Sequence, residues 1–351
     1  MRPFPGPVSG PAAGRSSPGP ELDSGTPVGW DGRVPTDIPT DTDTETATGS
    51  GQGAAGDGVD DAPTALFEEH RAMLLGVAYR MLGRVADAED VVQEAWLRWT
   101  SGDRSDVREP RAFLVRVTTR LALDRLRQAR ARRESYVGPW LPEPVFTDFG
   151  PAVPDTAERA LLVDSVSLAV LVVLESLSPL ERAVFVLREA FGFPYAEIAA
   201  VLDRGEPAVR QLAGRARRHV DEGRPRYDVD PAQRRELTER FLAAAAGGDL
   251  GELLALLAPD VRLVGDSGGK AKAPLRIIES ADKVGRFLAA VAPPVRTTHV
   301  HRFAEINGAP AVVTLVDGRP DSVLQLEVLD GRVHRVYLLR NPDKLRGLTG
   351  L

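Results

Sequence analysis

The chain contains no cysteine among its 351 residues. Disulfide bridges and zinc sites with thiolate ligands are therefore excluded as stabilising elements. No apolar run approaches the roughly 20 residues that a helix needs to cross a bilayer. The first residues, 1–7, also lack the apolar core of a signal peptide. Together these absences predict a soluble protein of the reducing cytoplasm, with no membrane partner.

Lysine is scarce as well, with four Lys against forty Arg. The formal net charge of -6 is unevenly spread, because ten acidic and only three basic residues lie within residues 1–61, and the rest of the chain carries +1. Residues 1–62 are dense in Pro, Gly, Ser, Thr and Asp and have few large apolar side chains. Such a composition cannot offset the entropy of ordering. We predict a disordered acidic extension, which either competes with DNA for basic helices or is inert.

Residues 178–220 have the pattern of three short helices. Ser178 can cap the first helix, and Gly192 ends it. The next two are expected over about 194–202 and 206–218, across a turn in which Asp203 stands where Gly is frequent. Asp tolerates the left-handed conformation that such a turn needs. The spacing is typical of a helix-turn-helix motif.

The third of these helices is expected to have an apolar and a cationic side. At about 100° per residue, the inward arc comprises Ala208, Val209, Leu212, Ala213 and Ala216. The outward arc is basic and carries few bulky side chains, so the helix can fit into a major groove about 12 Å wide. Its candidate DNA-binding residues are Arg210, Gln211, Arg217 and Arg218. The alternative is a solvated basic helix of a helical bundle.

An earlier helical unit begins near residue 64. Apolar spacing predicts helices over about 64–82 and 87–99, and the second should bury Val91, Val92, Ala95 and Trp99. A polar patch then remains outside, made of Asp90, Gln93, Glu94 and Arg98. Composition alone is equally consistent with a solvated face.

A long helix is predicted over 110–133. Its apolar arc comprises Phe113, Leu114, Val117 and Leu121. Four arginines fall within about 80° of one another on the opposite side: Arg116, Arg120, Arg127 and Arg130. Cations in one row repel each other unless an anionic partner lies beside them, and a nucleic-acid backbone is the natural partner.

Three separated motifs carry a resemblance: residues 87–96, residues 112–126 and the helix-turn-helix. In this order they resemble regions 2 and 4 of an extracytoplasmic-function (ECF) sigma factor of the sigma-70 superfamily, over about residues 64–221. The resemblance implies a partner in core RNA polymerase, through the clamp helices of the β′ subunit and through the β subunit, and a second partner in double-stranded promoter DNA. We expect a monomer before polymerase is bound.

The resemblance also implies roles for the basic helices. Asp90, Gln93 and Glu94 would dock on the clamp helices. Residues 110–133 would recognise and melt the -10 element, and the helix 206–218 would enter the -35 major groove. Arg120 stands where many such proteins have Asn, so base-specific roles in the -10 helix are not carried over.

The linker and the C-terminal part resemble the sigma-factor subgroup with a fused SnoaL-like domain. The linker segment around Trp140 and Pro142 is proline-stiffened, and its Trp either packs locally or docks on another domain. Helices are expected over 231–246, 249–257 and 282–291, followed by a curved antiparallel meander. Predicted strands cover residues 261–264, 275–278, 298–306, 311–316, 323–329 and 332–338. Hairpin turns are expected at Asn307-Gly308, Asp317-Gly318 and Asp330-Gly331.

The sequence contains two further motifs of this subgroup, at residues 266–270 and 341–345, and the first has Ser267 in place of the more usual Gly. The resemblance implies an interdomain regulatory role for the linker and motif residues, which are Trp140, Pro142, Asp266, Gly268, Gly269, Lys270, Asn341, Pro342, Asp343 and Lys344. The glycines imply a loop that approaches another surface closely.

The predicted fold class is multidomain, with two all-α helical domains followed by an α+β SnoaL-like cone domain with a pocket. The expected boundaries are 1–62 (extension), 63–134 (region 2), 135–160 (linker), 161–223 (region 4), 230–340 (SnoaL-like domain) and 341–351 (tail). The predicted function is promoter-specific transcription initiation modulated by the last domain.

Two other functional classes remain as alternatives. One is a helix-turn-helix regulator that senses a small molecule in the C-terminal pocket. The other is an enzyme with an accessory DNA module, with its polar candidates at Asp266, His299, His301, His334 and Tyr337. We predict no enzyme, no cofactor and no metal site, because the sequence has no Cys/His metal spacing, nucleotide-binding Gly loop or nucleophile elbow.

Overall fold

The computed structural model describes residues 61–101, 107–133, 135–147, 167–223, 230–291 and 299–348. The side chains of Arg130 and of residues 131–133 lie outside this description, as do residues 148–160 of the predicted linker. The extension that was predicted to be disordered, residues 1–62, also lies outside the described part, except for Asp61 and Ala62. These two residues belong to the first helix. All the described residues belong to one compact unit, and all contacts reported below lie within it.

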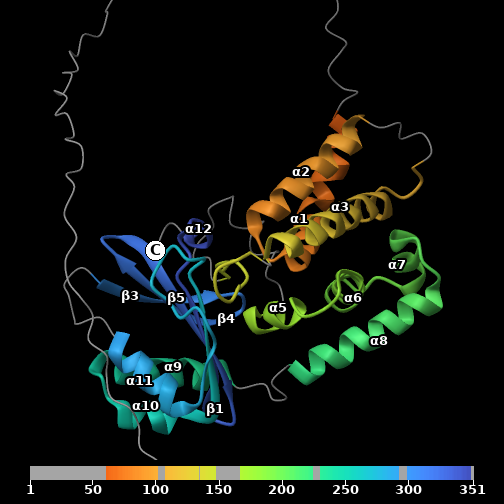
Figure 1. Ribbon diagram of the computed structural model, residues 1–351. Helices are drawn as coiled ribbons and strands as arrows, with labels where there is room; N and C mark the ends of the chain where they lie inside the picture. Colours follow the sequence, from red (N-terminus) through yellow and green to blue (C-terminus); the bar gives the residue numbers. More distant parts are fainter. Residues whose placement is uncertain are drawn as a thin grey trace, which may run out of the picture. The chain divides into compact units, whose positions relative to one another are not determined.

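Three helices make up the first helical part of the chain (Figure 1). They are α1 (Asp61–Leu82), α2 (Val85–Ser101) and α3 (Pro110–Arg133). Val91, Val92, Ala95 and Trp99 of α2 are buried, as the periodicity predicted. Aromatic pairs join the helices, with ring centroids 4.9 Å apart for Phe67–Trp96 and 5.8 Å for Trp99–Phe113.

In the second helical part, described from residue 167 to residue 223, the structure has four α-helices and one π-helical turn. They are α5 (Leu168–Leu174), α6 (Pro179–Phe185), η1 (Val186–Ala190), α7 (Tyr195–Leu202) and α8 (Glu206–Gly223). Ser178 caps α6 as predicted and forms a capping box with Glu181. The single helix expected up to Gly192 instead changes to π geometry from Val186 to Ala190. The apolar helix α5 was not predicted.

The two helical parts share one apolar core. Helix α3 packs against α1 and α2 on one side and against α6 and α7 on another. This explains why its buried surface is wider than the predicted arc around Leu114 and Leu121. Further buried residues of α3 are Val115, Thr118, Thr119, Ala122, Leu123 and Leu126. Periodicity could not anticipate a second packing face, because that face is supplied by a distant segment.

The C-terminal part is a six-stranded sheet in the order β2-β1-β6-β5-β4-β3. The strands are β1 (Leu257–Asp266), β2 (Ile278–Glu279), β3 (His299–Ile306), β4 (Ala309–Val316), β5 (Arg319–Leu329) and β6 (Arg332–Leu339). Strands β3 to β6 form the predicted antiparallel meander. The prediction was incomplete for β1, which pairs parallel to β6 and extends well beyond residues 261–264. The predicted strand 275–278 shrinks to the two residues of β2, because residues before Ile278 form a loop.

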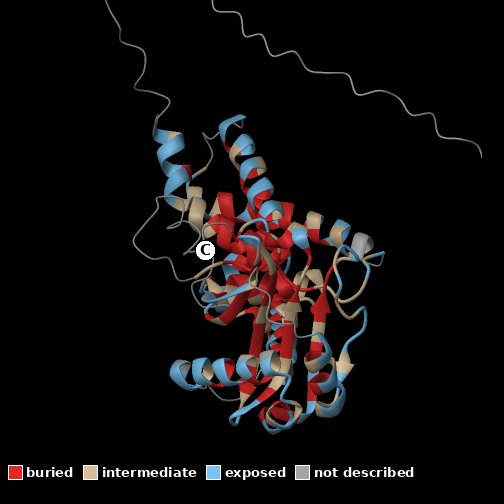
Figure 2. Cartoon of the chain, turned by 90° about the vertical axis from the view of Figure 1, so that its left-hand side faces the viewer, coloured by how far each residue is buried: buried red, intermediate tan, exposed pale blue. Residues whose placement is uncertain are grey.

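Each face of the sheet carries its own core. On one face, α9 (Pro231–Gly247), α10 (Leu250–Leu256) and α11 (Ala281–Val291) pack on strand residues such as Leu263 and Val336. On the other face, Leu141 of the linker and Leu168 of α5 join Val323 and Leu339 in a separate core. Figure 2 shows long buried stretches in the strands and exposed residues on the helices. The helices of the C-terminal part thus cover one face of the sheet, and the linker and α5 contribute to the core on the other.

The predicted hairpin turns are present. Asn307, Asp317 and Asp330 all have positive φ, and each is followed by a positive-φ glycine, as two-residue hairpins with Asn-Gly or Asp-Gly require. No helix of the described part is long and apolar enough to span a membrane.

Candidate nucleic-acid interface

Helices α7 and α8 form the helix-turn-helix expected from the sequence. Asp203 adopts the left-handed conformation, with φ 54° and ψ 54°, and the backbone N–H of Arg204 donates to the carbonyl of Ala199 at 3.0 Å. Ile198 and Val209 are fully buried between the elements. The turn therefore forms with Asp in place of Gly, because the conformation that it needs is open to Asp.

The exposed side of α8 carries the predicted DNA-binding residues. Arg210, Gln211, Arg217 and Arg218 are all exposed. Ala208 was predicted to face the protein interior, and this prediction was wrong because Ala208 is exposed. The buried arc centres on Val209, Ala213, Ala216 and Val220, and Ala208 lies about 100° from that centre.

Carboxylates and an aromatic ring hold two of these arginines. Arg210 pairs with Glu206 at 2.5 Å, and Arg217 with Glu189 at 2.6 Å. The hydrogen bond that Arg217 donates to the Glu189 carboxylate raises the pKa of Arg217, so its charge is fixed. The ring of Tyr195 lies under the guanidinium of Arg210, 4.9 Å away, and Arg188 lies 4.7 Å from the same ring. Sequence reasoning did not select Tyr195, although its position at the start of α7 was evident.

On α3, the predicted basic row is exposed where its side chains are described. Arg116, Arg120 and Arg127 are exposed, and Arg127 pairs with Asp124 of the same helix at 2.8 Å. Arg120 Nε donates to the carbonyl of Val201 in α7 at 3.4 Å. The prediction for Arg130 concerns a side chain outside the described part.

The polar patch on α2 forms ion pairs with Arg125 of α3. Asp90 and Gln93 are exposed and Glu94 is half-buried. Arg125 lies 2.9 Å from Asp90 and 3.7 Å from Glu94, and Arg98 lies 2.7 Å from Glu94. Both carboxylates thus already accept guanidinium groups in the free chain.

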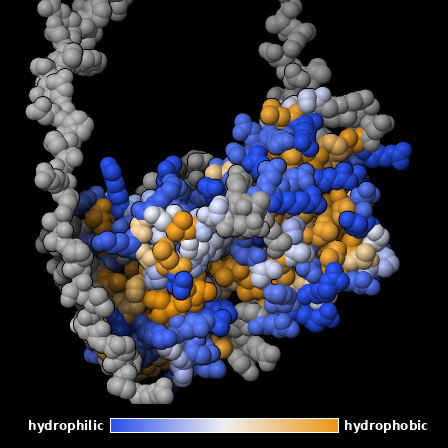
Figure 3. Space-filling view, in the orientation of Figure 1, coloured by the Kyte–Doolittle hydropathy of each residue, from blue (hydrophilic) through white to orange (hydrophobic). Residues whose placement is uncertain are grey.

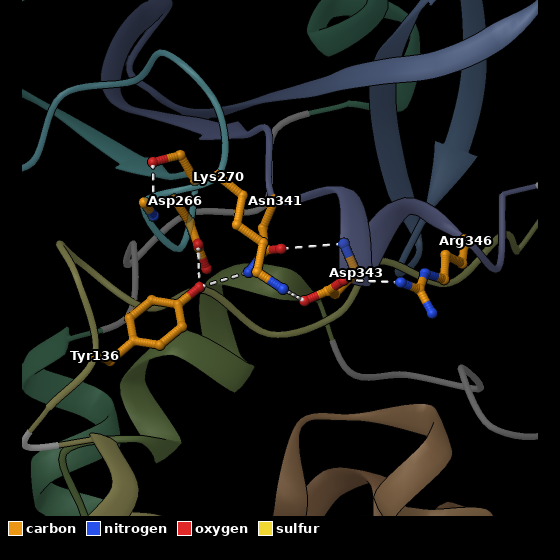
Figure 4. Close-up of polar contacts among 8 residues, drawn as sticks. Tyr136, Asp266, Lys270, Asn341, Asp343 and Arg346 are labelled. Carbon is orange, nitrogen blue, oxygen red and sulfur yellow. Dashed lines mark hydrogen bonds and ion pairs between the residues drawn. The ribbon is translucent and has the colours of Figure 1, made fainter. Parts of the chain in front are cut away.

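A buried polar network joins the linker to the C-terminal domain (Figure 4). Asp266, at the end of β1 and fully buried, accepts from Tyr136 Oη at 2.5 Å and from the backbone N–H of Leu141 at 2.7 Å. Lys344 Nζ lies 2.7 Å from Asp266 Oδ2 and also donates to the carbonyl of Leu141. Its ammonium group lies 3.9 Å from the centre of the Trp140 ring. Burial and the Asp266 carboxylate raise the pKa of Tyr136.

The two C-terminal motifs meet at the same place. Asn341 caps α12 (Pro342–Leu345) and donates to Tyr136 Oη at 2.7 Å. Lys270 pairs with Asp343, which lowers the pKa of that carboxyl group. A Cβ on Gly268 would lie 2.5 Å from Asn341 Nδ2, and one on Gly269 would lie 3.2 Å from Val137. Glycine is required here because of this close approach.

Pro142 is buried in the linker, whereas Pro342 is exposed at the first turn of α12.

Further buried contacts that the sequence did not predict join distant parts of the chain. Asn307 Nδ2 donates to Tyr79 Oη at 2.8 Å, and Tyr79 Oη donates to the carbonyl of Glu143 at 2.8 Å. Arg182, 1% exposed, pairs with Glu175 at 2.6 Å and donates to the carbonyl of Arg80 at 3.1 Å. Burial lowers the pKa of Arg182 to about 9. The Asn-Gly turn was predicted, but no local pattern identifies a partner in a distant helix.

Four of the polar residues considered for catalysis contact side chains outside that set. Asp266 is engaged by Lys344, whereas Tyr337 donates to Glu327 at 2.8 Å. His301 contacts Thr314, and His334 lies beside Asp260. Among the described residues, no group of three or more His, Cys, Asp or Glu could hold a metal ion.

Comparison with known proteins decides the family. Residues 66–132 match the Sigma-70 region 2 family model, and residues 167–220 match Sigma-70, region 4. The ECF RNA polymerase sigma factor SigJ of Mycobacterium tuberculosis is 43% identical over 293 residues, which cover 80% of this chain and 92% of the relative. The chain belongs to the ECF RNA polymerase sigma factor family.

Other relatives agree with this assignment. The probable ECF sigma factor SigI of the same organism is 36% identical over 81% of this chain and 95% of its own length. The crystal structure of M. tuberculosis SigJ matches with a TM-score of 0.64 and 40% identity, and covers 81% of this chain and 98% of that structure. The predicted fold class, two helical parts and an α+β SnoaL-like domain, is confirmed.

Proposed function

We propose that this sigma factor directs core RNA polymerase to promoters through α8 and α3, and that its C-terminal domain sets how readily it does so. The observation that carries the proposal is the polar face of α8. Its buried side completes the helix-turn-helix, while Arg210, Gln211, Arg217 and Arg218 face outward. Guanidinium groups on such a face can read guanine edges or hold phosphates in the -35 major groove.

For the -10 element we propose α3. The exposed row of Arg116, Arg120 and Arg127, continued in sequence by Arg130, would follow the DNA backbone while bases are held out of the stack. Opening the duplex requires no catalytic residue, because binding energy along a cationic surface can offset unstacking.

Polymerase would be captured by Asp90, Gln93 and Glu94 of α2, facing the clamp helices of the β′ subunit, while region 4 faces the β subunit. The carboxylates of Asp90 and Glu94 already accept arginine side chains of this chain, which supports their ability to accept basic groups of a partner. Such a factor acts where polymerase and DNA are, so we keep the prediction of a cytoplasmic location.

The regulatory role of the C-terminal domain is supported by its buried contacts with the linker. Lys344 and Asp266 fix the backbone of Leu141, so any movement of the domain changes the linker between the two DNA-binding parts. Four of the five catalytic candidates contact a residue outside the set, which favours a regulatory domain over an enzyme.

Run-off transcription with purified core polymerase tests the proposal. The full-length protein should produce transcripts from its promoter, and core alone should not. Binding of DNA without polymerase, together with no promoter-dependent transcript, would instead support a free-standing helix-turn-helix regulator, which the family assignment does not favour.

A further inference from the structure

Leu97 is the most exposed large apolar residue in the described part of the chain. Its exposed fraction is 57%, although it lies in the middle of a well-packed helix, α2. Its neighbours in sequence have other roles, because Trp96 packs on Phe67 and Arg98 pairs with Glu94. Figure 3 shows hydrophobic side chains in separate small patches on a mostly hydrophilic surface. A single exposed leucine is not unusual, so its surroundings must decide whether it has a role.

Leu97 shares one stripe of α2 with the three proposed docking residues. Asp90, Gln93, Glu94 and Leu97 stand at positions i, i+3, i+4 and i+7, which fall on one side of a helix within about 100°. The stripe therefore begins with polar groups and ends in an apolar side chain.

The charged groups of this stripe are already paired. Arg125 contacts both Asp90 and Glu94, and Arg98 contacts Glu94. Exposed pairs of this kind are strongly screened, and exchanging one cation for another changes the free energy little. Such ion pairs determine which charges a partner must carry and where, but they do not supply most of the binding affinity. Burial of Leu97 against a partner adds an apolar contribution to affinity that the charged groups do not supply.

We propose that Leu97 is the apolar anchor of the polymerase-docking surface, which is the stripe of Asp90, Gln93, Glu94 and Leu97. This inference rests on the proposed function. Its occupant is a basic helical segment of core RNA polymerase that places cations opposite Asp90 and Glu94 and an apolar pocket over Leu97. Complementary charge is the reason for this choice of occupant: the two carboxylates accept guanidinium groups at 2.7 and 2.9 Å in the free chain. An apolar anchor within a polar surround is the usual composition of an interface hot spot.

The experiment measures binding of fluorescently labelled full-length protein to purified core polymerase. Leu97→Ala should weaken binding about tenfold, and Leu97→Met, which retains apolar bulk, should stay within about threefold of the wild type. Leu275→Ala is the matched control, because Leu275 is 56% exposed in a loop of the C-terminal domain, and it should bind as the wild type does. Circular dichroism melting of each variant shows whether it is folded.

The outcomes separate this inference from the proposed function. If Glu94→Lys weakens core binding but a folded Leu97→Ala protein does not, the docking surface exists and Leu97 is not its anchor. If the wild type does not bind core at all, the proposed function itself fails. Loss of a self-associated form in Leu97→Ala, with core binding unchanged, would identify a second copy of the chain as the occupant and overturn the inference.

Discussion

Asn307, in a hairpin turn of the C-terminal sheet, donates a buried hydrogen bond to the hydroxyl of Tyr79 in α1, across 228 residues of sequence. The same amide group also pairs with the linker, since its Oδ1 accepts from the backbone N–H of Val145 at 3.1 Å. One side chain thus joins three parts of the chain. Burial raises the pKa of Tyr79, so it remains a neutral donor to the carbonyl of Glu143.

This bond predicts coupling between the two residues. Tyr79→Phe leaves the Asn307 amide without its acceptor and should cost about 1–3 kcal/mol. Asn307→Gly retains the left-handed turn, where φ is 51°, while deleting the amide. Urea denaturation of the two single variants and the double variant should give a coupling energy of about 0.5–3 kcal/mol. Strict additivity would show that the contact contributes nothing.

A second prediction concerns the ion pair of Lys344 and Asp266. Lys344→Met removes the cation and leaves a fully buried carboxylate with its two other donors, which should cost about 3–5 kcal/mol. Adding Asp266→Asn should recover part of this loss, because the amide is neutral. Thermal melting of the full-length variants measures both effects. A Lys344→Met protein as stable as the wild type would contradict a paired buried charge.

The linker glutamate predicts a pH effect. Burial raises the pKa of Glu143 above its ordinary value of 4.5, although it accepts from Val85 N at 3.1 Å. The folded protein therefore binds this proton more tightly than the unfolded chain, so the contribution of Glu143 to stability falls as pH rises from near 4.5 through the folded-state pKa. Glu143→Gln should remove that slope while keeping an acceptor for Val85. Melting temperatures of both proteins between pH 4 and 8 test this, and parallel curves would refute it.

For DNA recognition, Arg210→Ala should weaken binding of the holoenzyme to the -35 element by about 1–3 kcal/mol. The side chain is 62% exposed and touches only Glu206 and the Tyr195 ring among the contacts described, so core binding should be unchanged. Electrophoretic mobility shifts with promoter fragments, and a separate core-binding measurement, distinguish the two. A loss of core affinity would argue against a groove-facing role for α8.

Local features were predictable because local chemistry determines them. The cap at Ser178, the left-handed Asp203 and the hairpin at Asn307 follow from side chains that act on their own backbone. The outward position of Arg210 and Arg217 follows from helical periodicity. The roles of these arginines stay predictions.

Long-range features were not predictable in this way. Val115 and Ala122 of α3 are buried in the core that both helical parts share, and the parallel pairing of β1 with β6 depends on the path of the intervening chain. Arg182 illustrates the limit most clearly, since a residue type that is normally exposed is enclosed next to Glu175 and the carbonyl of Arg80. Its partner in α1, the carbonyl of Arg80, lies 102 residues away in sequence, so no local pattern points to it.

The short helix α5 belongs to two cores at once. Leu171 and Leu174 lie in the core of the helical parts, while Leu168 packs with strand residues of the C-terminal sheet. A fragment ending near residue 223 would leave Leu168, and Leu141 beside it, uncovered and prone to aggregation. Regulation by the last domain is therefore better studied with point substitutions at its buried contacts than with shortened proteins, whose loss of activity would have two causes.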